Sequence, residues 1–192
     1  MSEEQLYQKI YHVKEQLSEL QHHFWNQYSD FETWYFWFNL LSIFLPLLIL
    51  YVVADRKRLF EISFFGYTAH VLWSNIDSIL SSNNYLVHPH SLSYLLPVGF
   101  TVTTVVFPVT FMFVYQYCTH RGKNVFIYFT GMSFLFAYGF GGISILLGLL
   151  EMHKGMNLFY LFLIDIVVSF LAYGFTRLFI KIKHDKRAVP EK

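Results

Sequence analysis

The stretch WYFWFNLLSIFLPLLILYVVA, residues 34–54, decides the fold class because it is 21 residues long and carries no charge. An α-helix rises about 1.5 Å per residue, so about 20 apolar residues cross the ~30 Å hydrocarbon layer of a membrane. Four more stretches of this kind follow along the chain, at residues 59–80, 94–117, 125–150 and 158–180. The sequence therefore predicts an all-α, polytopic membrane helix bundle of about five transmembrane helices.

The composition favours the same class. Hydrophobic types make up 55% of the 192 residues and charged types 14%, whereas a soluble domain carries about 25% charged residues. The net charge of +1 gives no basic surface for nucleic acid, and the single cysteine, Cys118, cannot form an internal disulfide. The sequence contains no nucleotide-binding loop, nucleophile elbow or zinc-protease motif. We therefore expect the lipid bilayer as a partner, no nucleic acid and no cofactor.

The basic residues indicate an orientation. If the five spans alternate, one side of the membrane receives 11 of the 14 Lys and Arg residues, namely Arg56, Lys57, Arg58, Arg121, Lys123, Arg177, Lys181, Lys183, Lys186, Arg187 and Lys192. The other side receives 3, which are Lys9, Lys14 and Lys154. Basic residues concentrate in cytoplasmic loops. We therefore expect a protein of the cell membrane with its N-terminus outside and its C-terminus in the cytoplasm.

This orientation divides the chain into an extracytoplasmic segment (1–33), a membrane domain (34–180) and a basic cytoplasmic tail (181–192). The first segment has apolar residues at alternating spacings of four and three, which are Leu6, Ile10, Val13, Leu17, Leu20 and Phe24. Such a seam is typical of a coiled coil, and predicts a homodimer through residues 6–24. A helix lying along the membrane surface is the alternative interpretation.

Ionisable residues inside a span are costly and mark candidate functional positions. The second stretch places His70, Ser74 and Asp77 on one helix face. The full candidate cluster within the membrane is His70, Ser74, Asn75, Asp77, Asp165 and Ser169. In one interpretation the two aspartates bind a cation or relay protons. In the other, each carboxyl group is hydrogen-bonded to a neighbouring helix and holds the bundle together.

Three further groups of residues are candidates for structural or binding roles. Pro108 lacks the N–H that would bond the carbonyl of Thr104, which predicts a helix kink. Small residues recur in the fourth stretch and predict close helix packing, at Ser133, Ala137, Gly141, Ser144 and Gly148. A weaker hypothesis is a metal site at the outer surface. Its residues would be His88, His90, Glu151 and His153.

The third stretch resembles a known family. The residues Leu96–Pro97 and the run from Phe107 through Pro108 to Tyr117 (FPVTFMFVYQY), together with Asp77, are similar to a family of small multi-pass membrane proteins of unknown function from endospore-forming bacteria. The similarity covers residues 59–117. It implies a protein of the bacterial inner membrane, with an association with sporulation, and it implies no activity.

Three functions remain open at this point. The first is a non-enzymatic structural or assembly component of the bacterial envelope. The second is a small cation- or proton-coupled transporter or channel component that uses Asp77, Asp165 and His70. The third is an intramembrane enzyme that modifies lipids with an Asp–His pair. The first is favoured, because polar side chains commonly join membrane helices.

Overall fold

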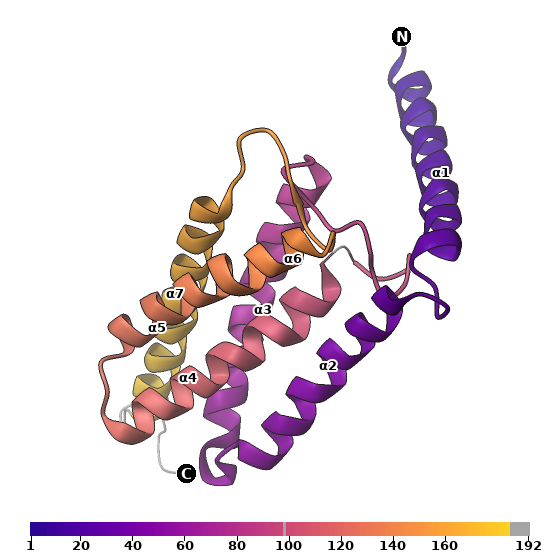
Figure 1. The fold of residues 1–192 in the computed structure, drawn as a ribbon. Coiled ribbons are helices and arrows are strands. Elements are labelled where there is room, and N and C mark those ends of the chain that lie inside the picture. The colour runs from indigo at the N-terminus through magenta and orange to yellow at the C-terminus, as the bar shows by residue number, and fades with distance from the viewer. Residues whose placement is uncertain (98, 185–192) are drawn as a thin grey trace, which may run out of the picture.

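The structure is a computed structural model, and it describes residues 1–97 and 99–184. This part of the chain is a bundle of helices with one short β-pair (Figure 1). The α-helices are α1 (Glu3–Tyr28), α2 (Trp34–Val53), α3 (Leu59–Ser82), α4 (Phe107–Arg121), α5 (Val125–Phe134), α6 (Gly142–Leu146) and α7 (Leu158–His184). The all-α fold class predicted from the sequence is confirmed.

In the described part of the chain, four helical segments are long and apolar enough to cross a membrane. They are Trp34–Val53, Val102–Arg121, Val125–Leu146 and Leu158–Lys183. The second predicted stretch forms α3, which has 24 residues, but its polar side chains lower its hydropathy and it does not join this group. That α3 also crosses the membrane stays a prediction.

Helix α3 lies against α4 and α7 and organises the core. The ring of Phe65 on α3 stacks on that of Tyr115 on α4, with centroids 4.6 Å apart. Phe111 on α4 and Phe129 on α5 are also fully buried in this cluster. Burying several aromatic side chains together gives strong packing and fixed ring geometry. The buried face of α3 and most of α4 therefore form the centre of the core.

A short β-pair ties two loops together at one end of the bundle. Strand β1 (Leu86–Val87) follows α3, and strand β2 (Glu151–Met152) precedes α7. They pair antiparallel, with Leu86 opposite Met152. The connections α2–α3 and α4–α5 lie at the opposite end of the bundle (Figure 1). In the orientation expected from the basic residues, the β-pair end is the outer end.

The predicted start of the third span is wrong. Residues 94–97 belong to an irregular segment, and helical structure begins at Phe100. Pro97 has no backbone N–H to donate and restricts the residue before it. Gly99 then takes the left-handed conformation, with φ of 68°. These two residues end the loop and set the helix start.

The expected kink at Pro108 takes the form of a π-helical turn, η2 (Val102–Val106). Phe107 donates its N–H to the carbonyl of Val102, five residues earlier. Such a widened turn accommodates a proline, which cannot donate to the carbonyl four residues before it. The widened turn includes Thr104 and lies close before Pro108, and the bend expected there stays a prediction.

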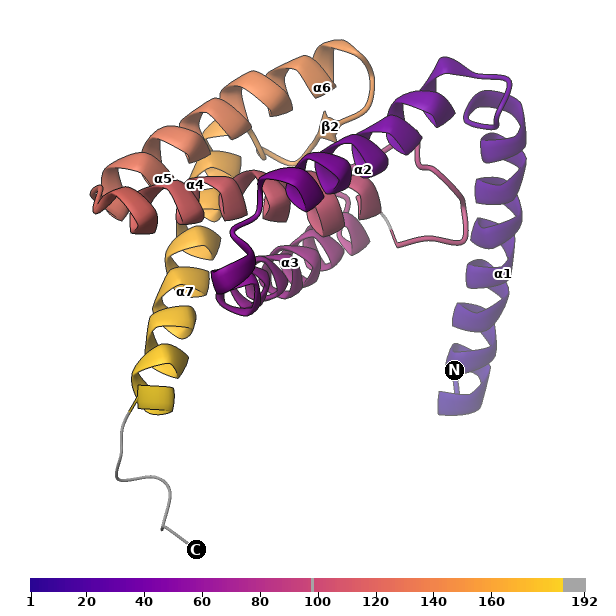
Figure 2. The same ribbon diagram turned by 90° about the horizontal axis from the view of Figure 1, so that it is seen from below.

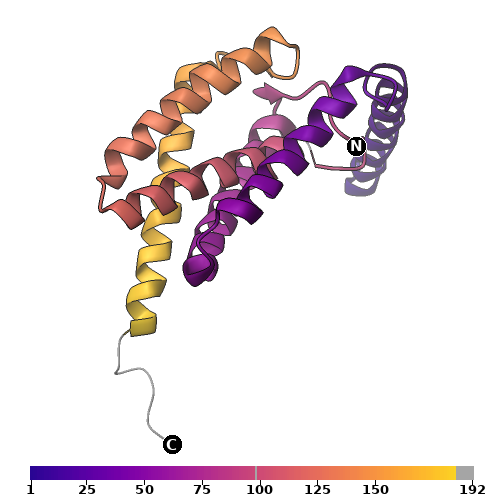
Figure 3. The ribbon, with the colours of Figure 1, turned by 60° about the horizontal axis from the view of Figure 1, so that its bottom comes forward.

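The predicted end of the fourth span is also wrong. Helix α5, the π-helical segment η3 (Leu135–Gly141) and α6 form one rod that crosses α7 (Figures 1 and 3). This rod ends at Leu146, because Gly148 has a φ of 71° and turns the chain. Gly148 therefore ends the rod and does not belong to a packing face. At the other end of the membrane domain, α7 continues past the expected residue 180 to His184.

Helix α1 stands apart from the bundle. It begins with a capping box in which Ser2 and Gln5 bond each other's backbone N–H groups. The chain turns after Tyr28, and α1 runs across the direction of α2 (Figures 1 and 2). Its seam residues are all exposed. The predicted tail 181–192 lies largely outside the described residues.

Candidate functional site

The candidate site is built around Asp77 on α3. Asp77 is 1% exposed. Oδ1 of Asp77 lies 3.0 Å from Nε2 of His88. The pairing of β1 with β2 places His88 here, because it turns the chain back across the end of α3. Sequence reasoning assigned His88 to a loop and Asp77 to a span, and the structure brings them together.

The second oxygen of Asp77, Oδ2, has no hydrogen-bond partner among the described residues. Gly99 lies directly against this oxygen, so that a Cβ atom at this position would collide with it. A side chain at Gly99 would also be strained by the positive φ. The carboxylate is thus held between the ring of His88 and Gly99.

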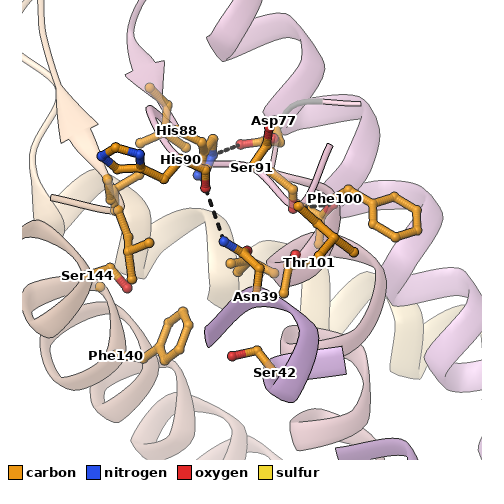
Figure 4. Close-up of a pocket in the computed structure, with 18 of the residues that line it drawn as sticks. Asn39, Ser42, Asp77, His88, His90, Ser91, Phe100, Thr101, Phe140 and Ser144 are labelled. Atoms are coloured by element: carbon orange, nitrogen blue, oxygen red, sulfur yellow. Dashed lines mark hydrogen bonds and ion pairs between the residues drawn. The ribbon is translucent and has the colours of Figure 1, made fainter. Parts of the chain in front are cut away.

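A cavity of about 60 Å³ lies beside this carboxylate. Its walls come from α2, α3, residues 86–96 and 99–103, the α5–α6 rod with the turn after it, and α7, as Figure 4 shows in part. Polar residues facing it include Asn39, Ser42, Asp77, Thr101 and Ser144. The wall is mostly apolar, and a cavity of this size has room for a few water molecules beside its polar groups. Its irregular wall fits the rule that non-helical backbone at membrane depth lines a cavity or is buried in protein.

Asn39 is a site residue that sequence reasoning missed. It is 7% exposed, and its side-chain amide donates to the carbonyl oxygens of Tyr35 and His90 at 3.0 and 3.3 Å. His90 stacks on the ring of Tyr35 with centroids 3.5 Å apart. The sequence feature that could have identified Asn39 is that it is a lone amide within the charge-free stretch 34–54. Asn39 connects α2 to the loop that covers the cavity.

Asp165 is completely buried and belongs to a different contact. Its Oδ1 accepts a hydrogen bond of 2.9 Å from the indole N–H of Trp73. Its Oδ2 has no partner among the described residues, and Asp165 is not part of the cavity wall. Trp73 does line the cavity, one helical turn from Asp77. The two aspartates therefore lie in separate contacts. The transporter hypothesis has them act together.

The other members of the predicted polar cluster bond to nearby backbone. Nδ1 of His70 lies 3.1 Å from the carbonyl oxygen of Thr103 and 3.0 Å from the hydroxyl of Ser74. Asn75 is exposed and donates to Val71 on its own helix, so its expected place in the cluster is wrong. Ser169 is buried and donates to Ile166, also on its own helix. A helix turns by about 100° per residue, which separates Asn75 from the face of Ser74 and Asp77.

At the opposite end of α3 is a network that sequence reasoning did not identify. Arg58 donates to both carboxylate oxygens of Glu61, at 3.2 and 2.5 Å. The hydroxyl of Tyr115 donates to the same carboxylate, and Arg58 also donates to Thr119. Pairing with the Glu61 carboxylate raises the pKa of Arg58 above its ordinary value. The sequence signal was the Arg-x-x-Glu spacing at the start of a helix.

The weak metal candidates separate into three contacts. His88 is bonded to Asp77, His90 lies 2.8 Å from the Ser29 hydroxyl, and Glu151 pairs with His153 at 3.2 Å. Among the described residues, no three His, Cys, Asp or Glu side chains converge. The short spacing of these histidines therefore does not produce a shared site.

The small residues of the fourth stretch mostly face the interior. Ser133, Ala137, Gly141 and Ser144 are buried. A Cβ atom on Gly141 would lie 3.1 Å from Leu161 on α7, so the two helices approach closely here. Small residues allow such close contact between membrane helices. Thr104 is half-buried and Pro108 buried at the widened turn.

No family model, no curated protein and no solved structure matches the chain. The resemblance to membrane proteins of endospore-forming bacteria stays a prediction. The fold and the site define a class, a polytopic α-helical protein with four apolar helices of membrane-spanning length.

Proposed function

We propose that this chain is a non-enzymatic multi-pass protein of the bacterial cytoplasmic membrane that acts as a structural or assembly component of the envelope. The observation that carries the proposal is the set of polar contacts along α3. Glu61 contacts Tyr115 of α4, His70 contacts Thr103 of η2, and Trp73 contacts Asp165 of α7. Each contact joins α3 to a different part of the bundle.

This pattern supports a structural role for the ionisable residues. A polar side chain within lipid has few alternatives to a partner on another helix, and such pairs specify which helices meet. Reactive chemistry would instead need two titratable groups brought to one accessible position. Asp165 and His70 lie in separate contacts. The two titratable groups that do meet, Asp77 and His88, have side chains only 2% and 11% exposed.

The partner that we propose is a second copy of the chain, through residues 6–24 of α1. Helix α1 is exposed over its whole length apart from the half-buried Trp25, where it approaches the loop. Its C-terminal end is fixed by Trp25, whose indole N–H donates to the carbonyl of Ser91 at 3.2 Å. An amphipathic helix fixed at one end and exposed along its apolar seam supports association with a matching helix.

Solubilised full-length protein provides the test. We expect it to migrate as a dimer or larger assembly in a mild detergent, and Asp165→Asn protein in liposomes to show the same ion permeability as the unchanged protein. A proton or cation flux that Asp165→Asn abolishes in well-folded protein would favour the transporter hypothesis. A monomer at all concentrations would count against the assembly role.

A further inference from the structure

An open hollow lies between the C-terminal ends of α2 and α4, at the opposite end of the bundle from Asp77 (Figure 1). Its volume is about 490 Å³. The side-chain amide of Gln116 on α4 fixes the two helix ends beside each other. It accepts a hydrogen bond of 2.8 Å from the backbone N–H of Asp55 and donates one of 3.1 Å to the carbonyl of Val53. The hollow is therefore part of how α2 packs on α4.

The lining of this hollow changes from apolar to basic toward the end of the bundle. Ile49 and Val53 on α2 and Phe113 on α4 are its apolar residues. His120 and Arg121, the last two residues of α4, line it at the end of the bundle. Helices α2 and α4 run in the same direction, so the apolar residues lie deeper than the basic ones (Figure 1). A phospholipid has the same order of chemistry, with apolar chains inside the membrane and a charged headgroup at its surface.

The charge at this end of the bundle favours an anionic ligand. Two carboxylates are present there among the described residues, and one of them, Glu61, is paired with Arg58. The other, Asp55, also lines the hollow and accepts the backbone N–H of Lys57. Arg121 forms no ion pair within the described part of the chain. The eight Lys and Arg residues at this end are Arg56, Lys57, Arg58, Arg121, Lys123, Arg177, Lys181 and Lys183. The excess of basic residues therefore attracts negative charge to the hollow.

From these observations we infer that the hollow between α2 and α4 binds one anionic phospholipid. Its phosphate lies at Arg121, whose planar guanidinium can donate two parallel hydrogen bonds to phosphate oxygens. One acyl chain follows Ile49 and Val53, which are 42% and 51% exposed. Basic pockets between membrane helices are known to bind anionic headgroups.

This inference rests on the membrane location that we propose, and it goes beyond the assembly role because the lipid site lies far from α1 (Figure 1). A monomeric protein would remove the assembly role and leave the lipid response intact. Loss of the lipid response alone would leave the dimer intact. The two proposals can therefore fail separately.

The chain contains a matched control for Arg121. Lys123 is exposed, lies two residues further along the chain and does not line the hollow. A general attraction between anionic lipid and positive charge would depend on both residues. A lipid bound in the hollow depends on Arg121 and not on Lys123.

The experiment measures thermal unfolding of the full-length protein in neutral detergent micelles with added lipid. Dioleoyl phosphatidylglycerol, which is anionic, is compared with dioleoyl phosphatidylcholine at equal mole fraction, and native mass spectrometry counts the bound lipid. We expect phosphatidylglycerol to raise the unfolding temperature saturably, with one lipid retained per chain, because a ligand that binds only the folded state stabilises it. Phosphatidylcholine and soluble glycerol phosphate, which has no acyl chain, should have little effect.

Two variants then locate the lipid. Arg121→Gln should raise the half-saturating fraction of phosphatidylglycerol several-fold, while Lys123→Gln should leave it unchanged. Ile49→Trp should also raise it, because the larger side chain fills the apolar part of the hollow without a change in charge. Ile49 and Arg121 are both exposed, so these substitutions leave the core intact.

Four results would overturn the inference. The first is an equal response to phosphatidylglycerol and phosphatidylcholine, and the second is a full response to glycerol phosphate. The third is an Arg121→Gln protein that responds like the unchanged protein, or a Lys123→Gln protein that loses as much as Arg121→Gln. The fourth is an Ile49→Trp protein with an unchanged half-saturating fraction, and this variant decides alone if Arg121→Gln does not fold.

Discussion

Trp73 on α3 donates its indole N–H to Asp165 on α7 across 2.9 Å, and both residues are at most 3% exposed. The bond joins two helices within the most extensive helix–helix contact of the bundle. It leaves one carboxylate oxygen enclosed without a partner among the described residues. The pair therefore favours this packing of α3 on α7, since a shifted register would separate the indole N–H from the Asp165 carboxyl group.

The first prediction concerns this bond. Trp73→Phe should lower the free energy of unfolding by about 1–3 kcal/mol, because it leaves the Asp165 carboxyl group buried without its donor. Asp165→Asn should cost less than Asp165→Leu, since an amide oxygen can still accept from Trp73. Denaturant unfolding in detergent micelles measures both effects. Trp37→Phe on the exposed face of α2 is the control, and an equal loss there would contradict the assignment.

The second prediction concerns helix packing at Gly141. Gly141→Leu should destabilise the protein by about 1–3 kcal/mol, the typical cost of overpacking, because a Cβ atom there already lies 3.1 Å from Leu161. Gly139→Leu is a matched control within the same π-helical segment, since a Cβ atom at Gly139 meets nothing within 4 Å. Unfolding temperatures of the two variants should differ clearly. Equal temperatures would show that the α7 contact at Gly141 is not tight.

The third prediction gives the direction in which two α1 helices pair. Two copies with the same orientation in a membrane are related by an axis along the membrane normal. Because α1 runs across the direction of α2, that axis places the two α1 helices antiparallel (Figure 2). The charges agree, since Lys9 and Lys14 flank the seam and would face each other in a parallel pair. Antiparallel pairing of the seam sets Val13 opposite Leu17 of the second copy.

Disulfide formation tests this arrangement in a Cys118→Ala background. Mixed Val13→Cys and Leu17→Cys copies, carrying different tags, should crosslink more efficiently than Leu17→Cys copies alone. The opposite result would indicate a parallel coiled coil. Absence of any crosslink between copies would leave α1 as a helix on the membrane surface.

The fourth prediction concerns pH and the contact between α1 and the loop. Burial lowers the pKa of His90, although the nearby Tyr28 backbone and the Glu151 charge oppose this change. The folded state therefore binds fewer protons than the unfolded state near and below the ordinary histidine value of about 6.5. Stability falls as the pH decreases through that range. The unfolding temperature should drop between about pH 7 and pH 5, and His90→Gln should reduce that drop.

The sequence predicted the helical class and located most helices, because hydrophobic length is a direct consequence of bilayer thickness. It also identified Asp77, Asp165 and His70 as residues with partners. Errors occurred where backbone geometry overrides hydropathy. Residues 94–97 and 147–150 are apolar enough for a helix, yet Pro97 and Gly148 exclude them from one.

The partners of the polar residues could not be predicted. His88 was read as a loop residue, and only the pairing of β1 with β2 brings it over Asp77. Strands of two residues carry no detectable sequence pattern. Trp73 is part of the apolar background in the sequence, and its N–H becomes informative only when α7 is placed beside it. Asn39 was visible as an isolated amide, but its contacts depend on the fold of the loop.

The polar contacts of α3 have a consequence for how the protein is made. Tyr115, Thr103, Asp165 and His88 all follow α3 in the chain, so a ribosome synthesises α3 before any of them. The polar contacts of α3 are therefore complete only after α7 has been synthesised, because Asp165 lies on α7.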